Sequence, residues 1–274
     1  MLIDIHGHPP RAEADTQRYL DALARWDSRL LVAALGPRAK GWQNEPEIDD
    51  WRIANDECAQ FVRQHPERLA AYVYVNPAHT REALDELECR FLKEPGPFVA
   101  LKLWVAVRAS DPRLDPLMEF CAAHAVPVLQ HTWMKVGPDG PGAGNLPGES
   151  TPLDLLALAR RHPRVQFFGG HIGGDWEWGV AALKQVDNVF LDVAGGESAG
   201  AYAQIALRAV GSGRIVYGTD VPGRSVPSQL SKILCLDVSS DDLDCMLWKN
   251  AALILGERLP AAWGVGGAAA ATSA

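Results

Sequence analysis

The chain has 274 residues, of which 47% are hydrophobic, and its formal net charge is -8. This length is enough for one large α/β core. The charge forms no long block of one sign, which argues against nucleic acid and anionic membranes as partners. No apolar run reaches about 18 residues, and no basic segment with an apolar one behind it opens the chain. We therefore expect a soluble, cytoplasmic protein.

Apolar runs typical of strands alternate with amphipathic runs typical of helices along the first half. The first run, 1–8, ends in His6-Gly7-His8, and the stretch 13–26 carries apolar residues at helical spacing. The following strands are predicted at 29–35, 69–75, 98–104 and 126–131, and the helices between them at 46–64, 80–93 and 112–124.

The second half repeats this alternation after a loop over 132–150 that is rich in Gly and Pro. Strands are predicted at 165–171, 188–193 and 214–219, and helices at 151–162, 176–186, 198–210, 227–234 and 241–255. Eight strand-then-helix units predict a single-domain (β/α)8 TIM barrel over 1–256. The competing fold is a doubly wound open sheet, whose Gly-rich phosphate turn is absent after the first strand.

The remaining segment, 257–274, is rich in Ala and Gly from 260 onward, so we expect it to be disordered or loosely docked. The five cysteines are odd in number and show no CxxC spacing. They are expected to be reduced thiols rather than a disulfide framework or a zinc cluster.

Imidazole, amine and carboxylate side chains recur where predicted strands end. Side chains at i and i+2 of a strand share a face, so His6 and His8 can converge on a metal, although such a pair can also be polar surface. The full set is His6, His8, Lys102, His131, His171 and Asp220. In a barrel these strand ends form the active-site face. Histidines and carboxylates with an open position suit catalytic zinc, iron or manganese.

Four segments in this order resemble the amidohydrolase superfamily. They are Asp-Ile-His6-Gly-His8, Val-Pro-Val-Leu-Gln-His131-Thr, Phe-Gly-Gly-His171-Ile-Gly-Gly and Val-Tyr-Gly-Thr-Asp220-Val-Pro. The similarity is greatest to the amidohydrolase-related branch that contains aminocarboxymuconate-semialdehyde decarboxylase. The ending Trp-Lys-Asn-Ala-Ala-Leu-Ile-Leu-Gly, 248–256, resembles the closing helix of that branch, so the resemblance covers nearly the whole chain.

The resemblance implies one divalent metal ion, with zinc expected first and manganese or iron as alternatives. It implies His6, His8, His131 and Asp220 as ligands, Asp220 as the base for the attacking water, and His171 as a catalytic group that polarises water or substrate. The implied reaction is metal-dependent hydrolysis of a small organic molecule, with carboxylated or aromatic compounds as candidate substrates. Non-oxidative decarboxylation is the alternative reaction, and a non-catalytic binding barrel is the alternative of another class. A homodimer is the expected oligomer.

Lys102 lies in a run that is otherwise built for burial, where an unpaired ammonium is costly. In binuclear relatives a lysine at this strand is carbamylated and bridges two metals. In the more similar branch it stays a plain lysine, and we favour its pairing with Asp220 or with a substrate carboxylate.

Candidate substrate-binding residues follow the same strands. Besides Lys102, these are Trp104, Trp133, Trp176 and Arg224, with Trp42 and Trp178 as further aromatics. The indoles can hold a planar ligand or can simply pack, and Arg224 can clamp a carboxylate or remain in solvent. Loop 132–150 is a lid or an ordinary loop. The end of the barrel where helices lead into strands, which serves stability, is the expected place of His65, His124 and His162. Asp4 and Asp192 are candidates for orienting an imidazole.

Overall fold

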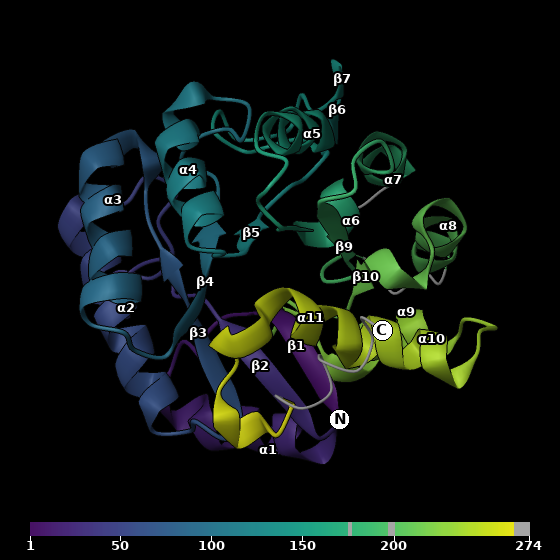
Figure 1. The fold of residues 1–274 in the computed structure, drawn as a ribbon, viewed down its shortest axis with the longest axis horizontal. Coiled ribbons are helices and arrows are strands. Elements are labelled where there is room, and N and C mark those ends of the chain that lie inside the picture. The colour runs from purple at the N-terminus through teal and green to yellow at the C-terminus, as the bar shows by residue number, and fades with distance from the viewer. Residues whose placement is uncertain (175–176, 197–200, 266–274) are drawn as a thin grey trace.

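Eight parallel strands form the centre of the molecule in the computed structural model, which describes residues 1–174, 177–196 and 201–265 (Figure 1). Each strand pairs with the next in the series. They are β1 (Leu2–Gly7), β2 (Ser28–Val32), β3 (Leu69–Tyr74), β4 (Phe98–Leu103), β5 (Val128–Gln130), β8 (Phe167–Gly169), β9 (Val189–Asp192) and β10 (Ile215–Val216).

The barrel closes between its first strand and the segment that contains β10. The Ile5 amide donates to the Tyr217 carbonyl at 3.0 Å, and the His8 amide donates to the Val221 carbonyl at 2.8 Å. Gly7 and Val221 form a parallel bridge. The predicted (β/α)8 barrel is therefore confirmed.

Helices surround the strands, as Figure 1 shows. They are α1 (Thr16–Arg25), α2 (Ile48–Arg63), α3 (Thr80–Glu88), α4 (Asp115–Ala123), α5 (Pro152–Arg161), α7 (Glu177–Leu183), α8 (Ala201–Val210), α9 (Val226–Leu234), α10 (Ser240–Asp244) and α11 (Asn250–Leu255). The start of α5 shows how the sequence encodes them: the Thr151 hydroxyl accepts from the Asp154 amide, and the Asp154 carboxylate accepts from the Thr151 amide. This reciprocal cap satisfies two amides that a helix start leaves unpaired.

The strands are buried on both faces because one face lines the barrel and the other packs under the helices. All six residues of β3 are buried, for example. The Tyr72 hydroxyl inside the barrel donates to the Ile5 carbonyl at 2.6 Å, so a polar group in the interior joins β3 to β1.

Several predicted elements are shorter than the sequence pattern suggested. β5 ends at Gln130 and β10 at Val216, so the reactive residues of these units lie just beyond the ladders. α3 continues as a π-helical turn over Cys89–Lys93. The helix predicted at 241–255 is divided into α10, a π-helical turn over Cys245–Lys249, and α11. Apolar periodicity detects the buried face of a helix but not a one-residue change in its winding.

Loop 132–150 contains a small antiparallel hairpin, β6 (Val136–Gly137) and β7 (Gly140–Pro141). The base of the loop is tied together: the Trp133 amide donates to the Ser150 carbonyl at 2.9 Å, and Asn145 Nδ2 donates to the Trp133 carbonyl at 2.8 Å. The loop is thus an ordered structure over the active-site end rather than a featureless connection.

Part of the segment that was expected to be disordered or loosely docked packs against the rest of the protein. Trp263, in the turn Ala261–Trp263, is 3% exposed and donates from Nε1 to the Pro66 carbonyl at 3.2 Å. A single large indole supplies enough apolar surface to dock a segment of mostly small residues. Residues 266–274 lie outside the described residues. None of the described helices is both long enough and apolar enough to cross a membrane.

Candidate metal centre and active site

The six reactive residues predicted from strand ends come together in the structure. His6 lies in β1 and Lys102 in β4, while His8, His131, His171 and Asp220 follow β1, β5, β8 and β10. They line one pocket of about 220 Å³. The pocket is completed by Leu35, Trp42, Trp104, Val105, Trp133, Lys135, Leu146, Glu149 and Arg224.

Left-handed backbone directs two of these residues inward. Asp220 has φ 65°, and His171 (φ 59°) opens a left-handed turn with Ile172 and Gly173 in the short segment α6 (Gly170–Gly174). Non-glycine residues seldom adopt this conformation, and such residues cluster at functional sites. Gly195 leaves room for the imidazole of His171, because a Cβ at position 195 would lie 2.1 Å from His171 Nδ1.

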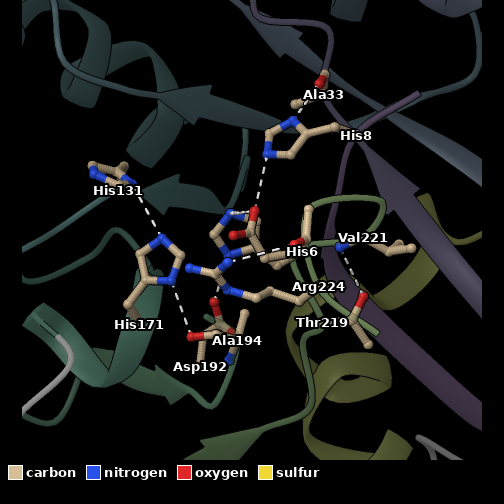
Figure 2. Close-up of polar contacts among 12 residues, drawn as sticks. His6, His8, Ala33, His131, His171, Asp192, Ala194, Thr219, Val221 and Arg224 are labelled. Carbon is tan, nitrogen blue, oxygen red and sulfur yellow. Dashed lines mark hydrogen bonds and ion pairs between the residues drawn. The ribbon is translucent and has the colours of Figure 1, made fainter. Parts of the chain in front are cut away.

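Each of the four imidazoles is held at its outer nitrogen by an oxygen. Figure 2 shows this contact for His8, with the Ala33 carbonyl, and for His171. His6 Nδ1 lies 2.6 Å from Asp192 Oδ2, and His8 Nδ1 lies 2.7 Å from the Ala33 carbonyl. His171 Nδ1 lies 3.0 Å from the Ala194 carbonyl, and His131 Nε2 lies 3.2 Å from Glu149 Oε1.

These oxygens fix the tautomers. A carbonyl or carboxylate only accepts, so each outer nitrogen donates and each neutral ring keeps its lone pair on the inner nitrogen. Metal-binding histidines have this arrangement. The inner nitrogens of His131 and His171 face each other at 3.2 Å, which brings two lone pairs together and favours a cation near them.

Three ligand atoms are positioned for one ion. The donor atoms of His6, His8 and Asp220 all lie within 4.8 Å of one another. Asp220 Oδ1 is 3.4 Å from His8 Nε2 and 4.0 Å from His6 Nε2. Two imidazoles and a carboxylate fit a divalent metal of the zinc or manganese type. His131, the fourth predicted ligand, is not in this group; its inner nitrogen contacts His171.

The protonation states agree with metal binding. Burial, reinforced by Lys102, holds the pKa of His6 well below its ordinary value, and burial with the nearby His6 does the same for His171. For Asp220, burial raises the pKa, but the contact with His8 and the neighbouring imidazoles outweigh it and hold that pKa well below its usual range. Neutral imidazoles and an ionised carboxylate are the forms that bind metals.

Lys102 is fully buried, and its Nζ donates to His6 Nε2 at 3.0 Å. Burial lowers the pKa of this ammonium to about 8. The favoured pairing with Asp220 is therefore not formed as a direct contact: Lys102 is bonded to the inner nitrogen of a ligand, and Asp220 acts on it only through space.

The predicted aromatic walls are present. Trp42 lies 4.8 Å from the His8 ring, and Trp133 is parallel to His131 at 6.3 Å and edge-on to His171 at 4.7 Å. Trp104 and Arg224 line the same pocket. Trp178 is 51% exposed and does not line it. The predicted substrate contact Trp176 lies outside the described residues.

Two side chains of the pocket, Glu149 and Lys135, carried no signal that the sequence analysis used. Both lie in loop 132–150, whose composition indicated only a loop. Asp192, a candidate for orienting an imidazole, does so by accepting from His6 Nδ1. Asp4 does not: its carboxylate accepts from the His6 amide and from the amide and hydroxyl of Thr219, so it ties β1 to the segment after β10.

The chain matches the sequence profile of the family described as amidohydrolase over residues 3–256. It therefore belongs to the amidohydrolase family, a class of metal-dependent enzymes. No curated protein matches the sequence.

Solved structures of similar fold cover almost the whole chain at low identity. A 2,6-dihydroxybenzoate decarboxylase from Rhizobium is 15% identical, with 93% of this chain and 98% of that chain covered and a TM-score of 0.70. A dihydroxybenzoic acid decarboxylase from Polaromonas sp. JS666, with bound manganese and 2-nitroresorcinol, is 16% identical, with coverages of 93% and 96% and a TM-score of 0.68. A 4-oxalomesaconate hydratase from Rhodopseudomonas palustris is 15% identical, with coverages of 98% and 99% and a TM-score of 0.65.

Proposed function

We propose that this protein is a metal-dependent decarboxylase of a small planar carboxylic acid. The observation that carries the proposal is the lining of the pocket: cationic Lys102, Lys135 and Arg224 lie around the ligand group together with three indoles, in a space of about 220 Å³. Indoles hold a planar ring, and cations hold a carboxylate. Decarboxylases of aromatic acids with the same fold support this choice of reaction.

His6, His8 and Asp220 would hold the metal, with His131 as the further ligand. We expect zinc or manganese, because the donor set suits both and a similar decarboxylase carries manganese. When bound, the ion supplies a positive charge that polarises a substrate oxygen. The remaining chemistry belongs to the side chains of this pocket.

Lys102 is placed to bind the carboxyl group of the substrate and to donate a proton. His6 Nε2 has one lone pair and cannot give it to both Lys102 and a metal. With His6 as a metal ligand, the Lys102 ammonium would therefore be available to a substrate carboxylate. Decarboxylation breaks the C–C bond, releases CO2 and leaves an electron pair on carbon, which a proton must take. Lys102, with a pKa of about 8, holds a proton at neutral pH, whereas Asp220 is ionised.

Trp42, Trp104 and Trp133 exclude water from the ring of the substrate, which strengthens every charge interaction inside the pocket. Arg224, a lining residue, is the cation available to a second polar substituent.

Hydrolysis is the second candidate, and the position of Asp220 favours it. An ionised carboxylate 3.4 Å from a ligand histidine is placed to take a proton from an attacking water. In that reaction the substrate would be a lactone or an amide, and no CO2 would form.

The test is a screen of metal-loaded protein against hydroxybenzoates, other aromatic carboxylates, lactones and amides, with CO2 and acid release measured separately. We expect metal-dependent CO2 release from an aromatic carboxylate, lost in Lys102→Met and retained in Lys184→Met, which alters an exposed lysine of the outer surface. Acid release from a lactone or amide without CO2 would replace the proposal with hydrolysis. No turnover of any class by metal-loaded protein would support the binding barrel.

A further inference from the structure

Glu149 joins a loop to the centre of the site. Its side chain is buried, and its carboxylate faces three donors: His131 Nε2 at 3.2 Å from Oε1, Lys135 Nζ at 2.8 Å from Oε2, and the Leu146 amide at 3.0 Å from Oε2. The last two belong to loop 132–150. One carboxylate therefore contacts both a predicted metal ligand and the loop above it.

The contact with His131 determines which nitrogen of this imidazole can bind a metal. Because a carboxylate only accepts, the hydrogen of the neutral ring lies on Nε2. The lone pair then lies on Nδ1, which faces the pocket interior and His171. Without an acceptor at Nε2, either tautomer would be available, and one of them directs an N–H toward the metal.

A carboxylate also holds the outer nitrogen of His6, in the first strand, but this carboxylate lies in a strand rather than in a loop. Asp192 accepts from His6 Nδ1 at 2.6 Å and lies in the rigid strand β9. Glu149 performs the equivalent contact from a loop, so its position depends on how the loop is folded. Lys135 and Leu146 fix that fold by binding the other carboxylate oxygen.

We propose that Glu149 is the positioning residue of His131 and couples loop 132–150 to the metal centre. It holds the Nε2–H, keeps Nδ1 directed into the site, and transmits occupancy of the centre to the loop through Lys135. This inference rests on the metal centre of the proposed function. It assigns to the loop a role in metal affinity in addition to covering the pocket.

The test compares three full-length proteins: the unchanged chain, Glu149→Gln and Asp139→Asn. Asp139 is an exposed acid of the same loop, so its variant removes an equal charge away from His131. Affinity for Zn²⁺ is measured by competition with a chromophoric chelator, and ligand geometry by the visible absorption of the Co²⁺ form. We expect Glu149→Gln to weaken Zn²⁺ binding about 10–100-fold and to change the Co²⁺ spectrum. Asp139→Asn should match the unchanged chain.

Equal Zn²⁺ affinity and an unchanged Co²⁺ spectrum in Glu149→Gln would overturn the inference while leaving the metal centre in place. Failure of the unchanged chain to bind any metal would instead reject the proposed function, and the inference with it. A second measurement needs no variant: the ¹⁵N shifts of the histidine rings in the metal-free protein report the tautomer. We expect the Nε2–H form for His131, and the Nδ1–H form would overturn the inference.

Discussion

The two ends of the barrel use their hydrogen-bonding side chains in different ways. Where helices lead into strands, the Asn188 side chain binds backbone carbonyls: its Nδ2 contacts those of Ala159, His162 and Val165 at 3.0–3.2 Å. At the opposite end, each of the four site histidines uses one ring nitrogen to fix its orientation and directs the other into the pocket. At the helix-to-strand end, the hydrogen bonds of Asn188 stabilise the backbone. At the histidine end, the inner nitrogens direct lone pairs into one pocket.

The difference also appears in the buried charges. At the site end, burial raises the pKa of Asp4 to about 8 and lowers the pKa of Lys102 to about 8, so both groups are held against their ordinary ionisation. Such groups lower the free energy of unfolding at neutral pH. The histidine end is thus organised for chemistry, whereas the other end supplies stability.

The largest expected effect breaks the metal centre itself. Joint replacement His6→Ala and His8→Ala removes two of the three converging ligands, so metal affinity should fall by more than about 100-fold, since even the loss of a ligand's hydrogen-bond partner costs about 10–100-fold. Elemental analysis of protein purified without added metal checks this.

The matched control for this prediction removes two histidines from the other end, as His65→Ala with His124→Ala, and should leave the metal content unchanged. Metal retained in the His6 and His8 variant would contradict the site. Elemental analysis of the unchanged protein also counts the ions. About one equivalent fits the group as described, whereas about two would support a carbamylated Lys102 and His171 as a ligand.

A smaller effect on stability is expected at Lys102. In the metal-free protein, Lys102→Met removes a buried ammonium and should raise the free energy of unfolding at pH 7. The difference between 10.5 and about 8 in the pKa corresponds to about 3 kcal/mol. Because the unfolded lysine keeps its proton up to the higher pH, the unchanged protein gains stability as the pH rises from about 8 to 10.5.

The advantage of Lys102→Met over the unchanged protein should therefore shrink across that pH range, as urea unfolding at several pH values would show. Lys184→Met, at an exposed position, should show no such pH-dependent difference. A lower stability of Lys102→Met at pH 7 would mean that the ammonium stabilises the site.

The sequence was sufficient for the barrel and for most of the site because both follow from local patterns. Apolar runs predict strands, and residues such as His171 and Asp220 are found by their place at strand ends. Once eight units are counted, barrel closure brings those ends together. The turn geometry that aims these two side chains inward was not encoded in any pattern of hydrophobicity.

Glu149 was missed for a physical reason. Its contact with His131 spans a loop of Gly and Pro residues whose path depends on the hairpin β6–β7 and on hydrogen bonds such as Asn145 Nδ2 to the Trp133 carbonyl. Periodicity has no meaning in such a segment, so an acid that reaches a buried imidazole cannot be distinguished from one in solvent. The burial of Trp263 was not predicted either. The Ala- and Gly-rich composition of the tail indicated disorder or loose docking, and one large side chain did not change that prediction.

The third prediction concerns the stability end alone. Asn188→Ala would leave three carbonyls without their shared donor, which should lower the free energy of unfolding by about 1–3 kcal/mol. Urea unfolding measures the loss, with Asn44→Ala at an exposed loop position as the control. Metal affinity should stay unchanged, because no ligand or ligand partner contacts Asn188. A variant that kept its stability but lost metal would show that the two ends are coupled, and the division between a chemical end and a stabilising end would then fail.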